Sequence, residues 1–230
     1  MITMDFLHGR NGAGKDTQAK LLKRTIISPG DMLRGAKKRV GRYAKFHDRL
    51  SHFFSESEQG TLLGDNEVMA LITEDLRDYQ AEGIEQFIFT GFPRTTGQLA
   101  LIDQFIARLR ETQPVIEHHV VYDITEATAM QRSLERKKLP VQGEAPRADD
   151  EPEIILRRSR DFDNITAPML INLEIENRLR RINGNSIEGV AATDWFFDGI
   201  FVPGLISVLH HLTAETLEGH HELHPTLSKL

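Results

Sequence analysis

The chain has 230 residues, a length that suits one α/β domain with appended segments, and 40% of its residues are hydrophobic. Its formal net charge of −6 argues against broad binding to nucleic acid. It contains no cysteine, which excludes a disulfide framework and a cysteine-based zinc site. No apolar stretch approaches the length of a membrane span, and no secretory leader pattern opens the sequence. We therefore expect a soluble, cytoplasmic protein with neither nucleic acid nor a membrane as its partner.

A glycine-rich loop near the start carries the clearest chemical signal. Residues 2–7 form an apolar run, residues 9–17 read Gly-Arg-Asn-Gly-Ala-Gly-Lys-Asp-Thr, and residues 18–22 continue with a helical pattern. In such a strand–loop–helix unit, glycines let backbone N–H groups turn toward phosphate oxygens, and Lys15 adds a positive charge. A glycine-rich turn with a chance lysine is the weaker alternative, because the flanking strand and helix are in register. The loop therefore predicts a phosphate-binding site.

Three further strand-like runs follow at the spacing of an α/β fold, at residues 86–90, 118–122 and 179–183. Helical patterns lie between them, and the last helix should be interrupted near Pro168. Strands that alternate with helices predict a parallel sheet with crossover helices. We expect the helices at residues 31–34, 66–79, 96–109, 126–137 and 151–179.

Six motifs follow one another along about 190 residues. They are Lys15-Asp16-Thr17-Gln18-Ala19 with its loop, residues 27–34, Gly91-Phe92-Pro93-Arg94-Thr95 with Gln98, Arg132 with Arg136, Arg147-Ala148-Asp149-Asp150 with Arg158 and Thr166-Ala167-Pro168, and Asn183-Gly184-Asn185. In these motifs and their order the chain resembles one known family, the adenylate kinases and their nucleoside monophosphate kinase relatives. Because only residues 137–150 are available for a lid, the chain resembles the short-lid members of this family, which lack a zinc-knuckle lid.

The resemblance implies a P-loop NTPase-type α/β fold, in which helices flank a parallel sheet. The nucleoside monophosphate kinase core would span residues 1–190, with a monophosphate-binding insertion at about 35–64 and a short lid at about 137–150. Residues 191–230 would form a C-terminal helical extension. Within the insertion, residues 42–54 read as one amphipathic helix.

The resemblance also assigns the site residues, many of which are arginines. Phosphoryl transfer needs positive charge around the oxygens of the moving group, and the planar arginine fork can bind two oxygens at once. The catalytic charges would be Lys15, Arg94, Arg136, Arg147 and Arg158. ATP would be bound by Gly9, Asn11, Gly12, Ala13, Gly14, Lys15, Asp16, Thr17, Arg132, Arg136 and Gly184. The monophosphate would be bound by Asp31, Arg34, Leu62, Leu63, Gly91, Arg94, Gln98, Arg147 and Arg158.

The implied reaction is transfer of a phosphoryl group from MgATP to AMP, which yields two ADP without a covalent enzyme intermediate. Mg²⁺ would enter with ATP and would have no direct protein ligand. Asp31 would hold it through water, and in one interpretation Asp16 would do so as well. ATP and AMP, or another nucleoside monophosphate, would be the partners of a monomer.

Three residues depart from the family pattern. Thr90 stands where the family has an aspartate that holds magnesium through water, and Asp16 stands where it has glycine. Asp16 either stabilises the start of its helix while facing away from the nucleotide, or supplies the carboxylate that Thr90 lacks. Pro29 replaces a threonine that touches the acceptor base, which weakens base discrimination although Gln98 still favours adenine.

These departures leave two alternatives to an AMP kinase open. One is a kinase for UMP or CMP or with relaxed specificity, and the other is a catalytically impaired nucleotide-binding protein. The two ends of the fold also differ from the family. The helix after the phosphate loop is short, and the apolar pattern from Trp195 to Leu212 predicts a helix that packs on the sheet or on a partner. We interpret His220 and His224 as part of a polar helix end rather than a metal site.

Overall fold

In the computed structural model, which describes residues 1–58, 61–138 and 151–185, five parallel strands form one sheet. The strand order is β2-β3-β1-β4-β5, so β1 is central. Because every pairing is parallel, the carboxyl ends of all these strands meet at one edge. The predicted α/β fold with a parallel sheet is therefore confirmed. The strands are β1 (Ile2–Gly9), β2 (Thr25–Ile27), β3 (Gln86–Thr90), β4 (Val115–Asp123) and β5 (Leu179–Asn183).

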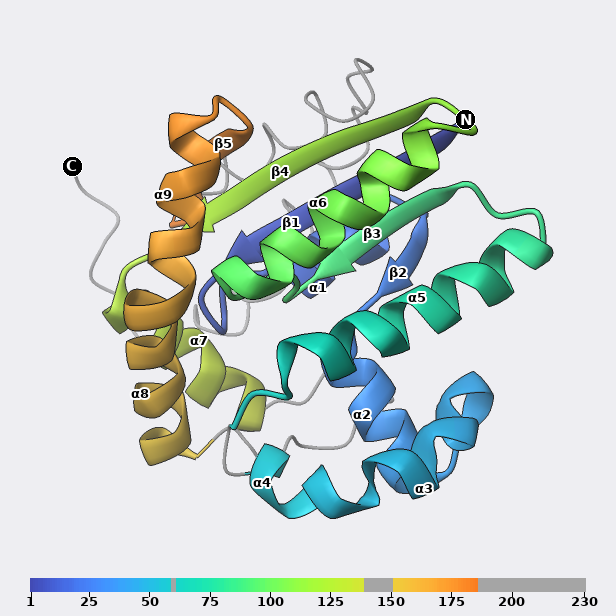
Figure 1. The fold of residues 1–230 in the computed structure, drawn as a ribbon. Helices are drawn as coiled ribbons and strands as arrows, with labels where there is room; N and C mark the ends of the chain where they lie inside the picture. Colours follow the sequence, from blue (N-terminus) through green and yellow to red (C-terminus); the bar gives the residue numbers. More distant parts are fainter. Residues whose placement is uncertain (59–60, 139–150, 186–230) are drawn as a thin grey trace, which may run out of the picture.

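Helices cover both faces of the sheet (Figure 1), with α6 (Thr96–Arg110) across the near face and α1 (Lys15–Leu21) behind it. The predicted helices near 66–79, 96–109 and 126–137 are confirmed, and the one at 31–34 is longer than expected. α1 has seven residues, which confirms the short helix after the phosphate loop. The remaining long helices are α2 (Pro29–Lys38), α5 (Asp65–Ala81), α7 (Glu126–Lys138), α8 (Pro152–Asp161) and α9 (Ala167–Ile175).

Each face of the sheet has its own apolar core. On the near face the rings of Phe6 and Phe89 stack with centroids 4.6 Å apart, and Ile102 of α6 packs in the same cluster. Behind the sheet, Ile88 and Val120 belong to a second, smaller cluster that also contains Ala19 of α1. Neighbouring strand residues alternate between the two clusters, as expected where a sheet is buried on both sides.

The strand β2 was missed by the sequence prediction, which recognised four strands. Its three residues lie directly between the end of α1 and the start of α2, and so short a run has no periodicity of its own. It pairs in parallel with β3, with Thr25 opposite Phe87 and Ile27 opposite Phe89. The strand adds an edge to the sheet and places the start of α2 beside the end of β3.

The expected single helix at residues 42–54 is wrong. The chain there forms short turns, η1 (Gly41–Phe46), α3 (His47–Leu50), η2 (Ser51–Phe53) and α4 (Phe54–Glu58). Arg42 at the start of this segment lies over the Tyr79 ring at 3.4 Å and forms an ion pair with Asp75 at 2.9 Å. These contacts with α5 anchor the segment, and such tertiary contacts override helix propensity.

The long helix expected over 151–179 is divided in two, and the interruption near Pro168 is confirmed. α8 is followed by one wide π-helical turn, η3 (Phe162–Thr166), before α9 begins. The N–H of Ala167 donates to the carbonyl of Phe162, five residues back. Pro168 occupies the first turn of α9, where its missing N–H costs nothing. α9 ends at Ile175 rather than 179, because Asn177 adopts a left-handed φ of 56°.

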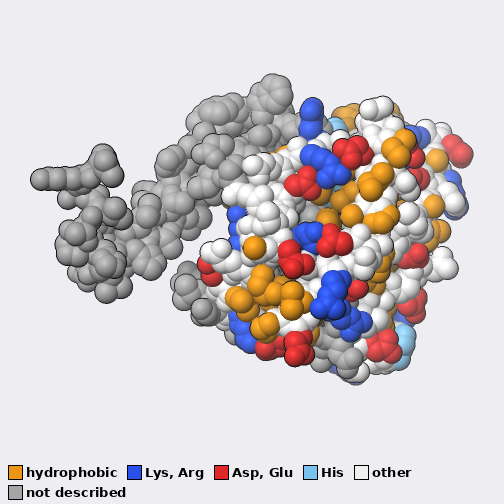
Figure 2. Space-filling view, turned by 90° about the vertical axis from the view of Figure 1, so that its left-hand side faces the viewer, with side chains coloured by type: hydrophobic (Ala, Val, Ile, Leu, Met, Phe, Trp, Pro, Cys, Tyr) orange, Lys and Arg blue, Asp and Glu red, His pale blue; other side chains and the backbone are white. Residues whose placement is uncertain are grey.

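The structure contains no helix, among its described residues, that is long and apolar enough to cross a membrane. Two of the sequence predictions lie outside the described residues: most of the lid with Arg147, and the 191–230 extension with Trp195, His220 and His224. Figure 2 views the molecule from the side of α8 and α9, where apolar patches alternate with lysine, arginine, aspartate and glutamate side chains. The exposed apolar residues Ile165, Ile171 and Ile175 belong to η3 and α9.

Candidate functional site

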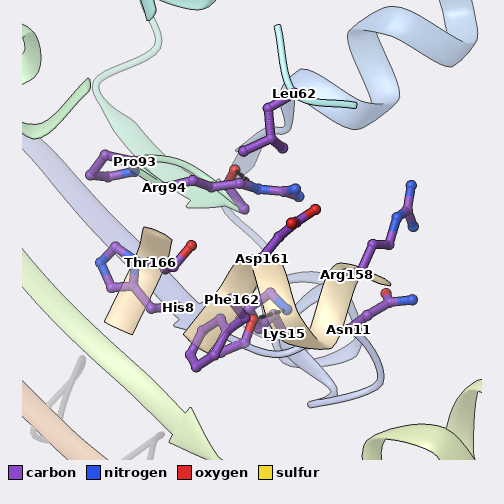
Figure 3. Close-up of a pocket in the computed structure, with 12 residues that line it drawn as sticks. His8, Asn11, Lys15, Leu62, Pro93, Arg94, Arg158, Asp161, Phe162 and Thr166 are labelled. Atoms are coloured by element: carbon purple, nitrogen blue, oxygen red, sulfur yellow. Dashed lines mark hydrogen bonds between the residues drawn. The ribbon is translucent and has the colours of Figure 1, made fainter. Parts of the chain in front are cut away.

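A polar pocket lies at the carboxyl edge of the sheet, where ligands bind in open parallel sheets. The end of β1 and its loop form its floor, the turn after β3 forms one wall, and α8 with η3 forms the other (Figure 3). Seven predicted residues line it: Gly9, Asn11, Lys15, Leu62, Gly91, Arg94 and Arg158. The other lining residues are His8, Pro93, Asp161, Phe162 and Thr166.

The glycine-rich loop is folded around its own lysine. Lys15 Nζ donates hydrogen bonds to the carbonyls of Gly9 and Arg10, each at 2.8 Å. Gly14 precedes α1 with a left-handed φ of 88°. The amide nitrogen of Asn11 is buried and has no hydrogen-bond partner among the described residues, although it lines the pocket. A buried donor without a partner is costly, so the pocket is suited to a ligand that brings acceptor oxygens.

Position 12 requires glycine for two reasons, its positive φ and the lack of space for a side chain. Its φ is 79°, and a Cβ atom there would lie 2.8 Å from the carbonyl oxygen of Ala129. We expect Gly12→Ala to lower the free energy of unfolding by about 1–3 kcal/mol more than Gly83→Ala. Gly83 has a similar φ of 81° but open space around its Cα, so it isolates the steric contribution. Urea unfolding monitored by circular dichroism measures both, and equal losses would contradict the steric argument.

The turn between β3 and α6 holds Arg94 in a network of main-chain contacts. Arg94 Nε donates to the carbonyl of Gly91 at 2.8 Å, and the Arg94 backbone N–H donates to Gln98 Oε1 at 2.8 Å. Thr95 caps α6 by accepting the Gln98 N–H at 2.9 Å, and its hydroxyl donates to Asp65 of α5. Gly91 has a φ of 67°, and a Cβ there would meet Arg94 Nη2 at 2.8 Å. The side-chain oxygen of Gln98 therefore positions the turn.

Arg10, which the sequence prediction did not place in the site, ties the phosphate loop to the opposite wall. Its Nη1 donates to Ser159 Oγ at 2.7 Å and to the Ser159 carbonyl at 3.1 Å. It also forms an ion pair with Asp163, and its guanidinium lies over the Phe162 ring at 5.0 Å from the centroid. Arg10 thus connects the loop to the elements that carry Arg158.

We expect this connection to set the spacing between the loop and Arg158. In a double-mutant cycle with Arg10→Ala and Asp163→Ala, the coupling in ATP binding free energy should be about 0.5–1 kcal/mol, at the lower end because Asp163 is half exposed. Isothermal titration calorimetry with ATP gives the four affinities. Arg160→Ala is the control, because Arg160 is an exposed arginine of α8, the helix that carries Arg158. This change should leave the ATP affinity within twofold of the wild-type value. Additive effects of the two alanine changes would contradict the coupling.

Several predicted residues lie outside this pocket. Asp31 and Arg34 form an ion pair with each other at the start of α2. Arg132 and Arg136 lie on α7, which packs against α8. Gly184 donates its N–H to the Asp123 carbonyl at 2.9 Å and adjoins a separate hollow at the carboxyl ends of β4 and β5. Leu63 belongs to the apolar core, and Gln98 is buried with its side-chain oxygen bound to the Arg94 N–H. The other predicted residues outside the pocket lining are those of the loop and of α1: Gly12, Ala13, Gly14, Asp16 and Thr17.

Some pocket-lining residues were not assigned to the site from the sequence, although the sequence contained a signal for them. Asp161 and Phe162 follow Arg158 at three and four residues, which places them on the same helix face. Pro93 and Thr166 belonged to quoted motifs but received no role. His8 had no such signal, because a histidine at the end of a buried strand is most often a structural residue. Its place beside Lys15 is evident only from the fold.

Comparisons of the sequence with known proteins identify related proteins. A family model described as "Adenylate kinase" matches residues 7–177. An adenylate kinase of Hyphomonas neptunium is 37% identical over 193 residues, which cover 81% of this chain and 93% of that protein. An adenylate kinase of Phenylobacterium zucineum is 35% identical over 192 residues, 81% of this chain and 92% of that protein. One of Fusobacterium nucleatum is 31% identical over 206 residues, with 80% and 92% covered.

Proposed function

The chain belongs to the adenylate kinase family, and from that premise we propose that it transfers the terminal phosphoryl group of MgATP directly to AMP. The observation that carries this proposal is that Lys15, Arg94 and Arg158 line one pocket at the carboxyl edge of the sheet. They come from three separate parts of the chain, so the fold gathers their charges. Such charges stabilise the equatorial oxygens of a phosphoryl group during in-line transfer.

The two sides of the pocket suit two different phosphate groups. The glycine-rich loop with Lys15 would bind the donor phosphates, and Arg94 with Leu62 would face the acceptor. The acceptor phosphate is already a nucleophile at neutral pH, so no general base is required. Arg132 and Arg136 on α7, with Arg147, would approach the donor from the lid side. The hollow beside Gly184 would hold the donor base.

The described residues fit a hydrated magnesium ion bound mainly by nucleotide phosphates. They contain no group of three histidine, cysteine, aspartate or glutamate side chains that could enclose a metal. Asp161 places a carboxylate in the pocket, and Asp31 is half exposed at the start of α2. One or two carboxylates that act partly through water match the way Mg²⁺ binds with phosphates. When bound, Mg²⁺ would offset charge on the donor phosphates.

Asp16 offers a direct test of the two interpretations of the loop. It lies in the first turn of α1, is partly buried and does not line the pocket. We expect Asp16→Gly to lower the free energy of unfolding by about 0.5–1 kcal/mol through lost helix propensity and helix-dipole interaction. Turnover and its magnesium dependence should stay unchanged. A higher magnesium requirement in this variant would instead show that Asp16 replaces the carboxylate missing at Thr90.

The identity of the acceptor base, proposed to be adenine, can be tested directly. Pro29 occupies the first turn of α2 and has neither a side-chain hydroxyl nor an N–H. Coupled ADP formation from ATP should be measured with AMP, UMP, CMP and GMP in turn, with and without magnesium. The expected result is magnesium-dependent turnover that is fastest with AMP. Faster turnover with UMP or CMP would overturn the AMP assignment, and ATP binding without transfer to any acceptor would favour the impaired nucleotide-binding protein.

A monomer in the cytoplasm, with ATP and AMP as its partners, completes the proposal. The mixed character of the α8–α9 face supports the monomer, since charged side chains divide its apolar patches (Figure 2). Stable interfaces between copies usually have a continuous apolar centre.

A further inference from the structure

Asp161 brings a carboxylate into a pocket that is otherwise suited to phosphate. Its side chain reaches from the end of α8 toward Arg94 on the opposite wall (Figure 3). No hydrogen bond or ion pair joins this carboxylate to another of the described residues, and it does not cap the helical turn that follows. A carboxylate in such a place repels a bound phosphate group unless a cation lies between them.

Two other carboxylates near this edge of the sheet have partners within the protein. Asp163, two residues farther along the chain, forms an ion pair with Arg10. Asp31 at the start of α2 forms an ion pair with Arg34. Asp16 in the first turn of α1 does not line the pocket. Their charges are therefore either matched or placed elsewhere, whereas the carboxylate in the pocket is available to a ligand.

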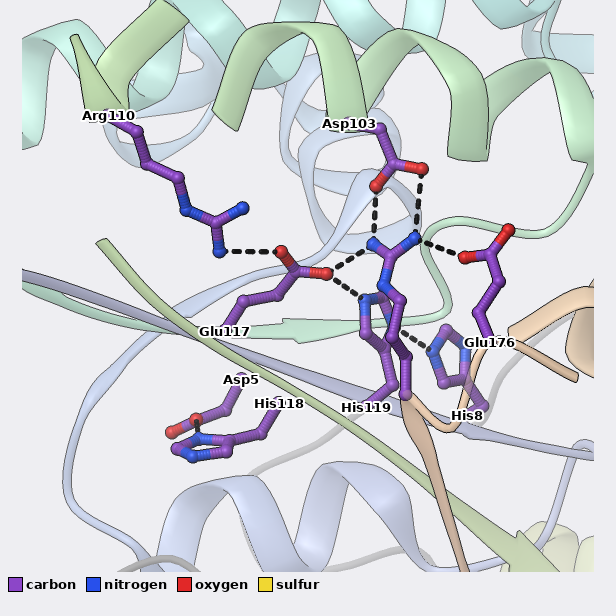
Figure 4. Close-up of polar contacts among 9 residues, drawn as sticks. Asp5, His8, Asp103, Arg110, Glu117, His118, His119 and Glu176 are labelled. Carbon is purple, nitrogen blue, oxygen red and sulfur yellow. Dashed lines mark hydrogen bonds and ion pairs between the residues drawn. The ribbon is translucent and has the colours of Figure 1, made fainter. Parts of the chain in front are cut away.

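Carboxylates in the interior of the fold are matched as well (Figure 4). Arg178 forms ion pairs with both Asp103 and Glu117. The buried Asp5 has an oxygen 2.8 Å from His118 Nδ1. These pairs follow the general rule that carboxylates shielded from water are paired with basic groups. An unmatched carboxylate inside a pocket departs from that rule, and a bound cation would remove the departure.

The position of Asp161 is fixed relative to the phosphate loop by Arg10. The Arg10 guanidinium donates to Ser159 Oγ, two residues before Asp161, at 2.7 Å, and pairs with Asp163, two residues after it. The turn that carries the carboxylate is thus bound on both sides to the loop that contains Lys15. Groups that hold a metal through its bound water need such support, because they act only at a defined distance.

The ligand that fits this carboxylate is a hydrated divalent cation. Mg²⁺ bound to nucleotide phosphates keeps several waters and needs only one or two carboxylates. Thr90 at the end of β3 is 3% exposed and brings no charge. We propose that Asp161 binds the water shell of the Mg²⁺ that enters with ATP, and so supplies the negative charge that position 90 lacks. The inference rests on the proposed function in one respect, that the donor is MgATP.

This role gives Asp161 opposite effects on ATP binding with and without magnesium. Without the ion, the carboxylate repels the triphosphate and lowers the affinity. With the ion, the carboxylate attracts the hydrated cation and raises the affinity. The gain in ATP affinity on addition of Mg²⁺ therefore measures the carboxylate. A carboxylate that accepted a hydrogen bond from a ribose hydroxyl would instead strengthen binding equally under both conditions.

Asp161→Asn removes the charge and keeps the shape of the side chain. Isothermal titration calorimetry gives the ATP affinity in excess Mg²⁺ and in EDTA, and the ratio of the two affinities is the magnesium preference. We expect the magnesium preference to fall about 10- to 100-fold in this variant, the usual effect of removing an outer-shell partner of a metal ion. The affinity in EDTA should rise above that of the wild-type protein. Asp161→Glu keeps the charge and should lose less of the preference.

Glu153→Gln is the matched control, because Glu153 is an exposed carboxylate in the first turn of α8, away from the pocket lining. It removes one negative charge from the same helix and should leave the magnesium preference within about twofold. Asp31→Asn tests the carboxylate that Arg34 already neutralises. A loss of the preference in Asp31→Asn but not in Asp161→Asn would overturn the inference, and so would equal changes of ATP affinity in Mg²⁺ and EDTA in Asp161→Asn.

This titration contains no acceptor nucleotide, so its outcome is separate from the test of phosphoryl transfer. If the wild-type protein binds MgATP but transfers phosphate to no acceptor, the proposed function fails and the magnesium preference still decides the role of Asp161. If ATP binding to the wild-type protein does not respond to Mg²⁺, the inference fails by itself. Turnover with AMP would then still support the proposed kinase.

Discussion

Replacing Lys15 with methionine should lower kcat about 100- to 1,000-fold, the usual cost of removing one preorganised charge from a transition state. Lys15 is held at the pocket floor by the carbonyls of Gly9 and Arg10, so its ammonium group is fixed before the nucleotide arrives. Methionine keeps most of the side-chain volume and removes the charge. A coupled assay with ATP and AMP measures the loss.

The control for this variant is Lys20→Met on the same short helix. Lys20 is exposed in the last turn of α1, away from the pocket lining. It should retain turnover within twofold of the wild-type protein. If Lys15→Met retained turnover to the same degree, the glycine-rich loop would not be the donor site.

Replacing Arg94 should impair the use of the acceptor AMP much more than the use of the donor ATP. We expect Arg94→Ala to lower kcat/KM for AMP about 100- to 1,000-fold while the KM for ATP changes much less. Arg94→Lys should recover only part of the loss, because an ammonium group cannot bind two phosphate oxygens in a planar fork. The fork is oriented by its Nε bond to Gly91, which a lysine cannot make in the same way. Initial rates over a grid of ATP and AMP concentrations give both constants.

Arg77→Ala provides the matched comparison, since Arg77 is an exposed arginine of α5. Its kinetic constants should stay close to those of the wild-type protein. An equal rise in KM for ATP and for AMP in Arg94→Ala would contradict the acceptor role. That result would place Arg94 between the two nucleotides.

Much of the sheet and of the site could be predicted because both depend on local patterns. Strands β1, β3, β4 and β5 appear as short apolar runs, and the phosphate loop and the Gly-Phe-Pro-Arg turn follow directly after two of them. Since parallel strands end at one edge, these motifs were expected to meet, and Lys15, Arg94 and Arg158 do line one pocket. The family match supplied the order of the motifs.

The features that were missed depend on contacts between distant residues. β2 has three residues and is defined by its pairing with β3. Arg10 acquires its role through partners about 150 positions away on α8 and η3. His8 of β1 and His119 of β4, whose rings hydrogen-bond to each other, are 111 positions apart in the chain. Periodicity and motif spacing carry no information about such pairs, because each partner alone resembles an ordinary polar residue.

The wide turn η3 makes the pocket, rather than the core, depend on the length of the chain between α8 and α9. It adds one residue to what would otherwise be a continuous helix, and both Asp161 before it and Thr166 at its end face the pocket. Deleting one residue there would restore regular winding and leave α9 in its present orientation, because the wide turn already absorbs the extra residue. Met169, Leu170 and Leu173 would stay in the core, whereas Asp161 and Thr166 would come one residue closer together along the chain at the pocket. A one-residue deletion in this segment should thus disturb the pocket more than the core.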